Sequence, residues 1–259
     1  MTEVNKTLYI PLYGKAYVSK KGIILNDKSA ERIWAKNEFK LKRRSSSRWL
    51  AYYMGMRAAI FDDWVSDKLK DDGNAVVLHI GCGLDGRVER VGADNLWYDL
   101  DFPEVIAERK KYFSENERYK MLGADLRDGE WLNDIADSRH AVVVMEGVSM
   151  YVSHTDLISF IERLDGRFES VSLMMDCYSV FAARMSKIKN PVNDVGVTQV
   201  YGVDNPEEIS VGRIRFLREW NMTPEHRIRE LEGLERFIFG KVYGGRTSRK
   251  LYKLYEFKK

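Results

Sequence analysis

The sequence predicts an α/β fold built on a doubly wound, mostly parallel β-sheet. From about residue 70 onward, short apolar segments alternate with stretches of helical spacing, and the first apolar segment stops at a glycine-rich turn. The predicted strands are residues 75–80, 96–100, 119–122, 141–145 and 170–175. Strands that alternate with helices pair in parallel, so we expect helices on both faces of the sheet.

Residues 1–73 precede the first strand and predict helices. Two segments, Lys28–Phe39 and Trp49–Leu69, carry apolar residues at helical spacing. The apolar residues expected near one face of the longer helix are Tyr52, Met56, Ala59, Ile60 and Trp64. We expect residues 1–73 to form a helical lid with one long helix, and residues 74–259 to form the core with a C-terminal cap.

The composition limits the class of protein and its partners. The 259 residues are 44% hydrophobic and carry a net charge of +3, which fits one large core and no nucleic-acid partner. Cys82 and Cys177 lack metal-ligand or C-x-x-C spacing, so we expect structural thiols, a reducing compartment and no metal. Neither a signal peptide nor a membrane span of about 18 apolar residues is visible. We therefore expect a cytoplasmic protein without a membrane partner.

The first predicted strand runs directly into the turn Gly81-Cys82-Gly83-Leu84-Asp85-Gly86. Without a Cβ, Gly81 and Gly83 can adopt positive φ and let a ligand approach the backbone closely. A turn of this kind at the carboxyl end of a parallel strand is typical of a site for an adenosine-bearing ligand. Its spelling, G-x-G-x-x-G, leaves both a dinucleotide and S-adenosylmethionine (SAM) open.

An acid follows the second predicted strand at the spacing of a ribose site. Asp101 comes 18 residues after Gly83, where ribose-binding folds place a carboxylate that accepts hydrogen bonds from the sugar hydroxyls. Asp101 also precedes Pro103, so it can instead cap the helix that opens there. The upstream glycine turn favours the ribose interpretation.

Polar residues follow the third and fourth predicted strands as well. Asp125 can accept from an adenine amino group while the Leu126 amide donates to a ring nitrogen, although the same residues can form an ordinary charged loop. Glu146 ends an apolar strand, where a carboxylate without partners is costly to bury. We therefore expect Glu146 to face a ligand.

Together these residues resemble the leucine carboxyl methyltransferase family and its tetracenomycin-type polyketide O-methyltransferase relatives, from about Arg57 to Tyr178. The resemblance implies a seven-stranded, Rossmann-like methyltransferase fold with SAM as cofactor and S-adenosylhomocysteine as product. It implies that Arg57, on the helix before the first strand, contacts the SAM carboxylate. The other cofactor residues that it implies are Gly81, Gly83, Asp101, Asp125, Leu126 and Glu146. The chain departs from the family at Gly86, where relatives usually carry threonine.

Two alternatives to this reading come from other functional classes. An NAD-type oxidoreductase needs a sustained helix whose amino end faces the pyrophosphate. After Gly86, only residues 87–91 can be helical before Gly92. So short a helix is a poor binding site for a pyrophosphate, which favours SAM over a dinucleotide. A SAM-binding module without catalysis is the second alternative, because a fold and a ligand site do not guarantee chemistry.

Methyl transfer from a sulfonium is an in-line displacement, so the protein mainly has to align the reactants. A carboxylate acceptor is ionised at neutral pH and needs no general base. The sequence offers no obvious base, since His79 lies inside a strand and is expected to pack in the core. We therefore expect O-methylation of a carboxylate on a small natural product or a peptide C-terminus, with a phenolic hydroxyl or peptide α-amine as the alternative. Candidates that would position the acceptor are Tyr151, Tyr178, Arg48 and Arg184.

Overall fold

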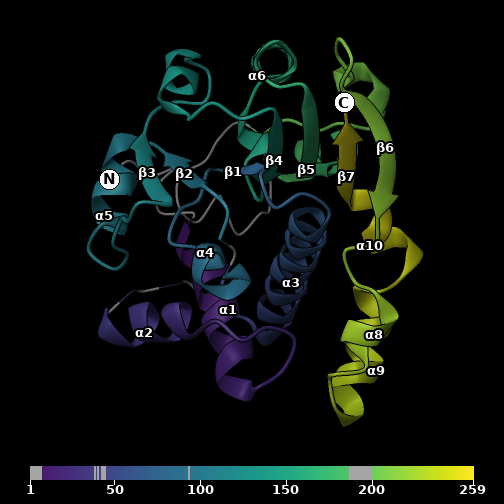
Figure 1. Cartoon of the computed structure of the whole chain (residues 1–259). Helices are drawn as coiled ribbons and strands as arrows, with labels where there is room; N and C mark the ends of the chain where they lie inside the picture. The colour runs from purple at the N-terminus through teal and green to yellow at the C-terminus, as the bar shows by residue number, and fades with distance from the viewer. Residues whose placement is uncertain (1–7, 38, 40, 42–44, 93, 187–199) are drawn as a thin grey trace.

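The computed structural model describes residues 8–37, 39, 41, 45–92, 94–186 and 200–259. Within these residues, seven strands form one sheet in the order β3-β2-β1-β4-β5-β7-β6 (Figure 1). The strands are β1 Val76–Ile80, β2 Trp97–Asp101, β3 Tyr119–Gly123, β4 His140–Met145, β5 Ser170–Tyr178, β6 Arg215–Trp220 and β7 Tyr252–Lys258. The first five are parallel, and β7 runs antiparallel between β5 and β6. The predicted doubly wound, mostly parallel sheet is confirmed.

Helices cover both faces of the sheet (Figure 1). Those before β4 are α1 Tyr9–Lys21, α2 Lys28–Lys36, α3 Arg48–Asp71, α4 Arg87–Val91, α5 Pro103–Arg109 and η2 Glu130–Asp134. Those after β4 are η3 Ser149–Tyr151, α6 His154–Arg167, α7 Val180–Ser186, η5 Pro206–Ile209, α8 Glu225–Ile228, α9 Gly233–Val242 and α10 Arg246–Leu251. Figure 1 shows α1, α3 and α4 on one face of the sheet and α6 on the other.

Alternate residues of the central strands supply two separate cores. On β4, Val142 and Val144 join the apolar cluster that contains α1, α3 and α5, whereas Val143 joins the cluster that contains η2 and α6. Both faces of these strands are therefore buried, which explains their continuous apolar sequences. The residues predicted on one face of α3 are all buried in the first cluster: Tyr52, Met56, Ala59, Ile60 and Trp64.

The long helix α3 connects the N-terminal segment to the sheet. It begins where the Ser47 hydroxyl accepts a hydrogen bond from the Leu50 N–H at 3.3 Å, as an N-cap serine does. Its apolar cluster runs from Leu12 of α1 through Phe61 of α3 to Val144 of β4. The division of the chain at residue 73 stays a prediction. No helix among the described residues is both long and apolar enough to cross a bilayer.

Candidate cofactor and acceptor site

A cavity of about 590 Å³ opens at the carboxyl ends of the parallel strands. The residues that line it come from α1, α3 and β7, from the carboxyl ends of β1, β2 and β5, and from the segments that follow β1 to β4. All seven predicted cofactor residues are among them: Arg57, Gly81, Gly83, Asp101, Asp125, Leu126 and Glu146. The structure thus gathers in one cavity residues that the sequence spreads over 90 positions.

The glycine turn has the backbone that its sequence predicts. Gly81 and Gly83 have φ values of +66° and +51°, in the left-handed region that favours glycine. A Cβ on Gly81 would lie 2.2 Å from Val148 Cγ2, so a side chain there would also clash with the loop after β4. After the turn, α4 spans only Arg87–Val91, as expected from the sequence. The turn therefore leaves open backbone, and not a long helix, facing the cavity.

The carboxylate of Asp101 accepts hydrogen bonds from this turn and from the residue that follows β2. Its Oδ2 accepts a 2.8 Å hydrogen bond from the Gly83 N–H, and its Oδ1 accepts a 2.8 Å bond from the Phe102 N–H. The N-cap of α5 is Phe102, without a side-chain capping bond, so the capping alternative for Asp101 is not what the structure contains. Burial raises the pKa of Asp101 to about 6, against the hydrogen bonds from the two backbone amides.

Arg57 extends from α3 into a cluster of buried polar side chains. Its Nε lies 3.0 Å from Glu146 Oε1, and its Nη1 lies 2.9 Å from Asp176 Oδ2 and 2.6 Å from the Tyr252 hydroxyl. The remaining nitrogen, Nη2, donates no hydrogen bond to any residue that the structure describes. A Cβ on Gly147 would lie 3.3 Å from Nη2, so the absent side chain leaves room beside that nitrogen. An anionic group in the cavity would fit there.

Glu146 faces the cavity but has two cationic partners. Arg57 binds one carboxylate oxygen and Arg87 Nη2 binds the other. Burial by itself would raise the pKa of Glu146, but the two guanidinium groups lower it to about 2. The two arginines therefore compensate the buried negative charge of Glu146, for which the sequence predicts a ligand-facing role.

Two cations of the cavity wall, Lys15 and Arg127, are absent from the predicted site residues. Arg127 pairs with Asp125. Lys15 lies on α1, is buried, and places Nζ 3.1 Å from Asp85 Oδ2. Asp85 is in turn 2.7 Å from Arg90 Nη1, and these cations hold its pKa well below the usual range despite burial, which acts the other way. No local pattern around Lys15 predicts its position, because α1 carries no recognisable motif and reaches the turn only through tertiary packing.

His79 also touches the cavity, but both of its ring nitrogens are engaged. Nδ1 lies 2.9 Å from Asp99 Oδ1, and Nε2 lies 3.2 Å from Arg87 Nη1. Since a guanidinium can only donate, Nε2 accepts and Nδ1 carries the proton that is donated to Asp99. Burial lowers the pKa of His79. The ring is therefore a neutral core group, as predicted, and not an available general base.

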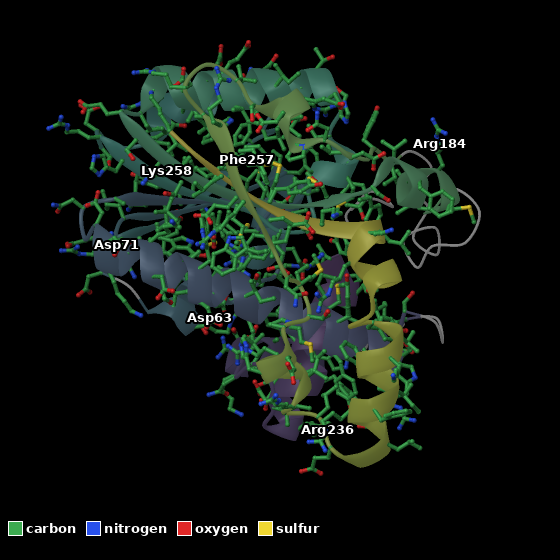
Figure 2. The ribbon with its side chains drawn as sticks, turned by 90° about the vertical axis from the view of Figure 1, so that its right-hand side faces the viewer. Asp63, Asp71, Arg184, Arg236, Phe257 and Lys258 are labelled. Carbon is green, nitrogen blue, oxygen red and sulfur yellow. The ribbon has the colours of Figure 1, made fainter. Side chains whose placement is uncertain are left out.

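Apolar and phenolic side chains also line the cavity. Tyr151 and Tyr178, two of the residues predicted to position the acceptor, are among them. Others are Leu8, Ile10, Leu50, Tyr53, Met54, Met150 and Tyr252. The structure does not bring Arg48 or Arg184 to this wall. Arg48 pairs with Glu235 at 2.8 Å, and Arg184 is exposed on α7 at the edge of the molecule (Figure 2).

The described residues contain no group of three or more histidine, cysteine or acidic side chains that could hold a metal ion. The donor set of the cavity instead suits an adenosine ligand that carries an amino acid. The cavity wall contains the open backbone of the glycine turn, the Asp101 carboxylate and the Arg57 guanidinium, whose Nη2 donates no hydrogen bond to a described residue.

Comparisons with known proteins agree with this geometry. The family model of leucine carboxyl methyltransferase matches residues 7–165. The tetracenomycin polyketide synthesis O-methyltransferase TcmP of Streptomyces glaucescens is 27% identical over 243 residues, which are 92% of this chain and 90% of TcmP. The SAM-dependent methyltransferase dpfgK of Gibberella zeae is 24% identical over 233 residues, which are 81% of this chain and 78% of dpfgK.

Solved structures share the fold at low sequence identity. Magnesium protoporphyrin IX methyltransferase from Synechocystis PCC 6803, with bound S-adenosylhomocysteine, has a TM-score of 0.51 at 11% identity and covers 98% of this chain and 99% of its own. The N-methyltransferase NodS from Bradyrhizobium japonicum WM9, in complex with S-adenosylhomocysteine, has a TM-score of 0.51 at 10% identity. The match covers 94% of this chain and 98% of NodS. The predicted Rossmann-like methyltransferase fold is confirmed.

Proposed function

The chain belongs to the leucine carboxyl methyltransferase family and is a SAM-dependent methyltransferase, and we propose that it methylates a carboxylate oxygen of a small acidic acceptor. One observation supports this choice most directly. His79 is the one histidine among the described lining residues, and both of its nitrogens are engaged. A carboxylate acceptor is already ionised at neutral pH, so it needs no base.

The cavity divides into a cofactor end and an acceptor end in this proposal. When bound, SAM supplies a methyl group on a positively charged sulfur. Asp101 accepts hydrogen bonds from the ribose hydroxyls, and Asp125 with the Leu126 amide contacts the adenine. Gly81 and Gly83 let the methionine part pass close to the backbone. Arg57 donates from Nη2 to the methionine carboxylate.

The acceptor enters from the apolar and phenolic end. Leu50, Met54 and Met150 bury its carbon skeleton, while Tyr151 and Tyr178 are the phenols that can donate to its carboxylate. Their task is to hold the acceptor oxygen in line with the methyl group, since alignment supplies much of the rate in such displacements. The cavity of about 590 Å³ has to hold SAM as well, which favours a small natural product as the acceptor, and a peptide C-terminus is the other acceptor of this kind. The two cysteines are free and buried, which is in keeping with our proposal of a cytoplasmic enzyme.

Labelled SAM with a panel of acids, phenols and peptides tests this proposal. We expect methyl transfer to an acid, with the label located on a carboxylate by mass spectrometry and released by mild alkali. Transfer to a phenol or an α-amine, with a methyl group that resists alkali, would replace the carboxylate proposal by the alternative acceptor class. Absence of S-adenosylhomocysteine formation with every acceptor would leave a binding module.

A further inference from the structure

Tyr252, on β7, makes a contact that the cofactor motifs do not explain. Its hydroxyl donates to Asp176 Oδ2 and accepts a 2.6 Å hydrogen bond from Arg57 Nη1. We propose that Tyr252 and Asp176 are positioning residues that hold the Arg57 guanidinium in the orientation that binds the SAM carboxylate. The inference deepens the proposed function, because it rests on the proposed contact between Arg57 and SAM.

The geometry of the guanidinium group carries the argument. Nε is held by Glu146 of the β4 end, and Nη1 is held by Asp176 of β5 together with Tyr252 of β7. The group is planar and rigid, so fixing two of its nitrogens fixes the direction of the third. That third nitrogen is Nη2, which lies beside Gly147 in the cavity wall. A donor held in place before the ligand arrives loses less side-chain entropy on binding.

Asp176 ties the arginine to the adjacent loop as well. Its Oδ1 accepts a 2.7 Å hydrogen bond from the Gly147 N–H, while its Oδ2 is shared by Arg57 and Tyr252. The carboxylate is fully buried, so each of these bonds is shielded from water. Asp176 therefore sets the distance between Nη2 and the open space at Gly147, where the anionic end of the cofactor is proposed to lie.

Tyr252 is placed to act on Arg57 and not merely to fill the core. Its ring lies 4.8 Å from that of Tyr178 and 6.0 Å from that of Tyr53, and it lines the cavity. Both Tyr252 and Asp176 lie beyond residues 7–165, the part of the chain that the family model matches. The C-terminal part of the chain thus contributes to the cofactor end of the cavity through β7.

Calorimetric titration with SAM and steady-state kinetics test the proposal on the full chain. Tyr252→Phe keeps the ring and removes the hydroxyl, so we expect the Kd and KM for SAM to rise about threefold to tenfold. Because Tyr252 also lines the cavity, the deciding measurement is the Kd for SAM in the absence of acceptor. Asp176→Asn should act in the same direction. Loss of folded protein would instead lower kcat and leave the Kd unchanged.

Tyr255→Phe is the matched control. Tyr255 is also a buried tyrosine of β7, but its hydroxyl lies 3.5 Å from the Asp204 carbonyl oxygen, and its ring packs in the apolar cluster that contains η2 and α6 and not in the one that contains α3. We expect its Kd for SAM to equal that of the wild-type protein. If Asp176→Asn does not fold, the pair Tyr252→Phe and Tyr255→Phe still decides the question.

Arg57→Ala separates this inference from the proposed function. An unchanged Kd for SAM in Arg57→Ala would show that Arg57 does not hold the cofactor, and the proposed contact would fail. If Arg57→Ala weakens binding, adding Tyr252→Phe to it should have no further effect, since a residue that acts through Arg57 has nothing left to position. A further, additive loss in the double variant would overturn the positioning role, as would an unchanged Kd in Tyr252→Phe alone.

Discussion

Arg57 and Glu146 form a buried ion pair with an Nε–Oε1 distance of 3.0 Å, which joins the middle of α3 to the end of β4. Because Arg87 holds the other oxygen of Glu146, one carboxylate connects the long helix, the sheet and α4. Both arginines are buried, and each would lose one of its ion pairs if the carboxylate were removed, keeping Asp176 beside Arg57 and Asp62 beside Arg87. The pair therefore couples the stability of the cavity to the ionisation of Glu146.

The first prediction concerns acid unfolding. The pKa of Glu146 is lowered to about 2 in the folded protein from 4.5. A depressed carboxylate pKa stabilises the fold above pH 4.5, and this contribution is lost as the pH falls toward 2. Glu146→Gln should lower the free energy of unfolding by roughly 3 kcal/mol at pH 7 and by much less near pH 2. Urea titrations of both proteins at several pH values measure this difference, and a constant gap across that range would contradict it.

Asp101 should make SAM binding depend on pH in a different range. Burial raises its pKa to about 6, and the proposed hydrogen bonds from the ribose hydroxyls favour the ionised form. The Kd for SAM should therefore rise about tenfold between pH 7 and pH 5, because protonation must be reversed before binding. Asp101→Asn should bind SAM more weakly and lose this dependence. If the variant kept the pH profile of the wild type, another group would be responsible.

Arg90 is predicted to stabilise the N-terminal region against the turn. Its guanidinium binds Asp27, Asp62 and Asp85, which come from the α2 N-terminus, α3 and the glycine turn. Arg90→Ala leaves two buried carboxylates, Asp27 and Asp85, and the partly buried Asp62 without this partner, so the free energy of unfolding should fall by about 3–5 kcal/mol. Arg229→Ala breaks an exposed pair with Glu225 and should change it by about 0.5 kcal/mol or less. Equal effects of the two substitutions in denaturant titrations would refute the prediction.

The acceptor class predicts the pH profile of the rate. At saturating SAM, transfer to a carboxylate should vary by no more than about threefold between pH 6 and pH 8, since such an acceptor is ionised throughout. Transfer to a phenol without a base should instead rise by about tenfold per pH unit. Tyr151→Phe should raise the KM for the acceptor and leave the Kd for SAM unchanged, which initial rates and calorimetry can separate. A steep pH profile would favour the phenol acceptor.

Local sequence signals were sufficient for the parallel half of the fold. The predicted strand at residues 75–80 is observed as Val76–Ile80, and the predicted strand at 141–145 as His140–Met145. Apolar β-branched runs bounded by turn residues carry this information within a few positions. The same holds for Gly81 and Gly83, whose positive φ follows from the turn that they form.

The contacts that organise the site were not accessible in this way. The insertion of β7 between β5 and β6 is a long-range pairing, and no local pattern around Tyr252 indicates it. Glu146 illustrates the same limit. The sequence predicts that burying the Glu146 carboxylate is unfavourable without a partner. The cations that compensate its charge come from α3 and α4, and their positions depend on how these two helices pack in the tertiary structure.

The hydrogen bond between Arg57 and Tyr252 joins residues that are 195 positions apart. Closing so long a loop is entropically expensive, and contacts of this kind tend to slow folding. We therefore expect refolding chains to regain the parallel strands before they can bind SAM, with a measurable delay between the recovery of far-ultraviolet circular dichroism and that of ligand binding. SAM would then act as a probe of complete folding, binding only those molecules in which β7 has entered the sheet.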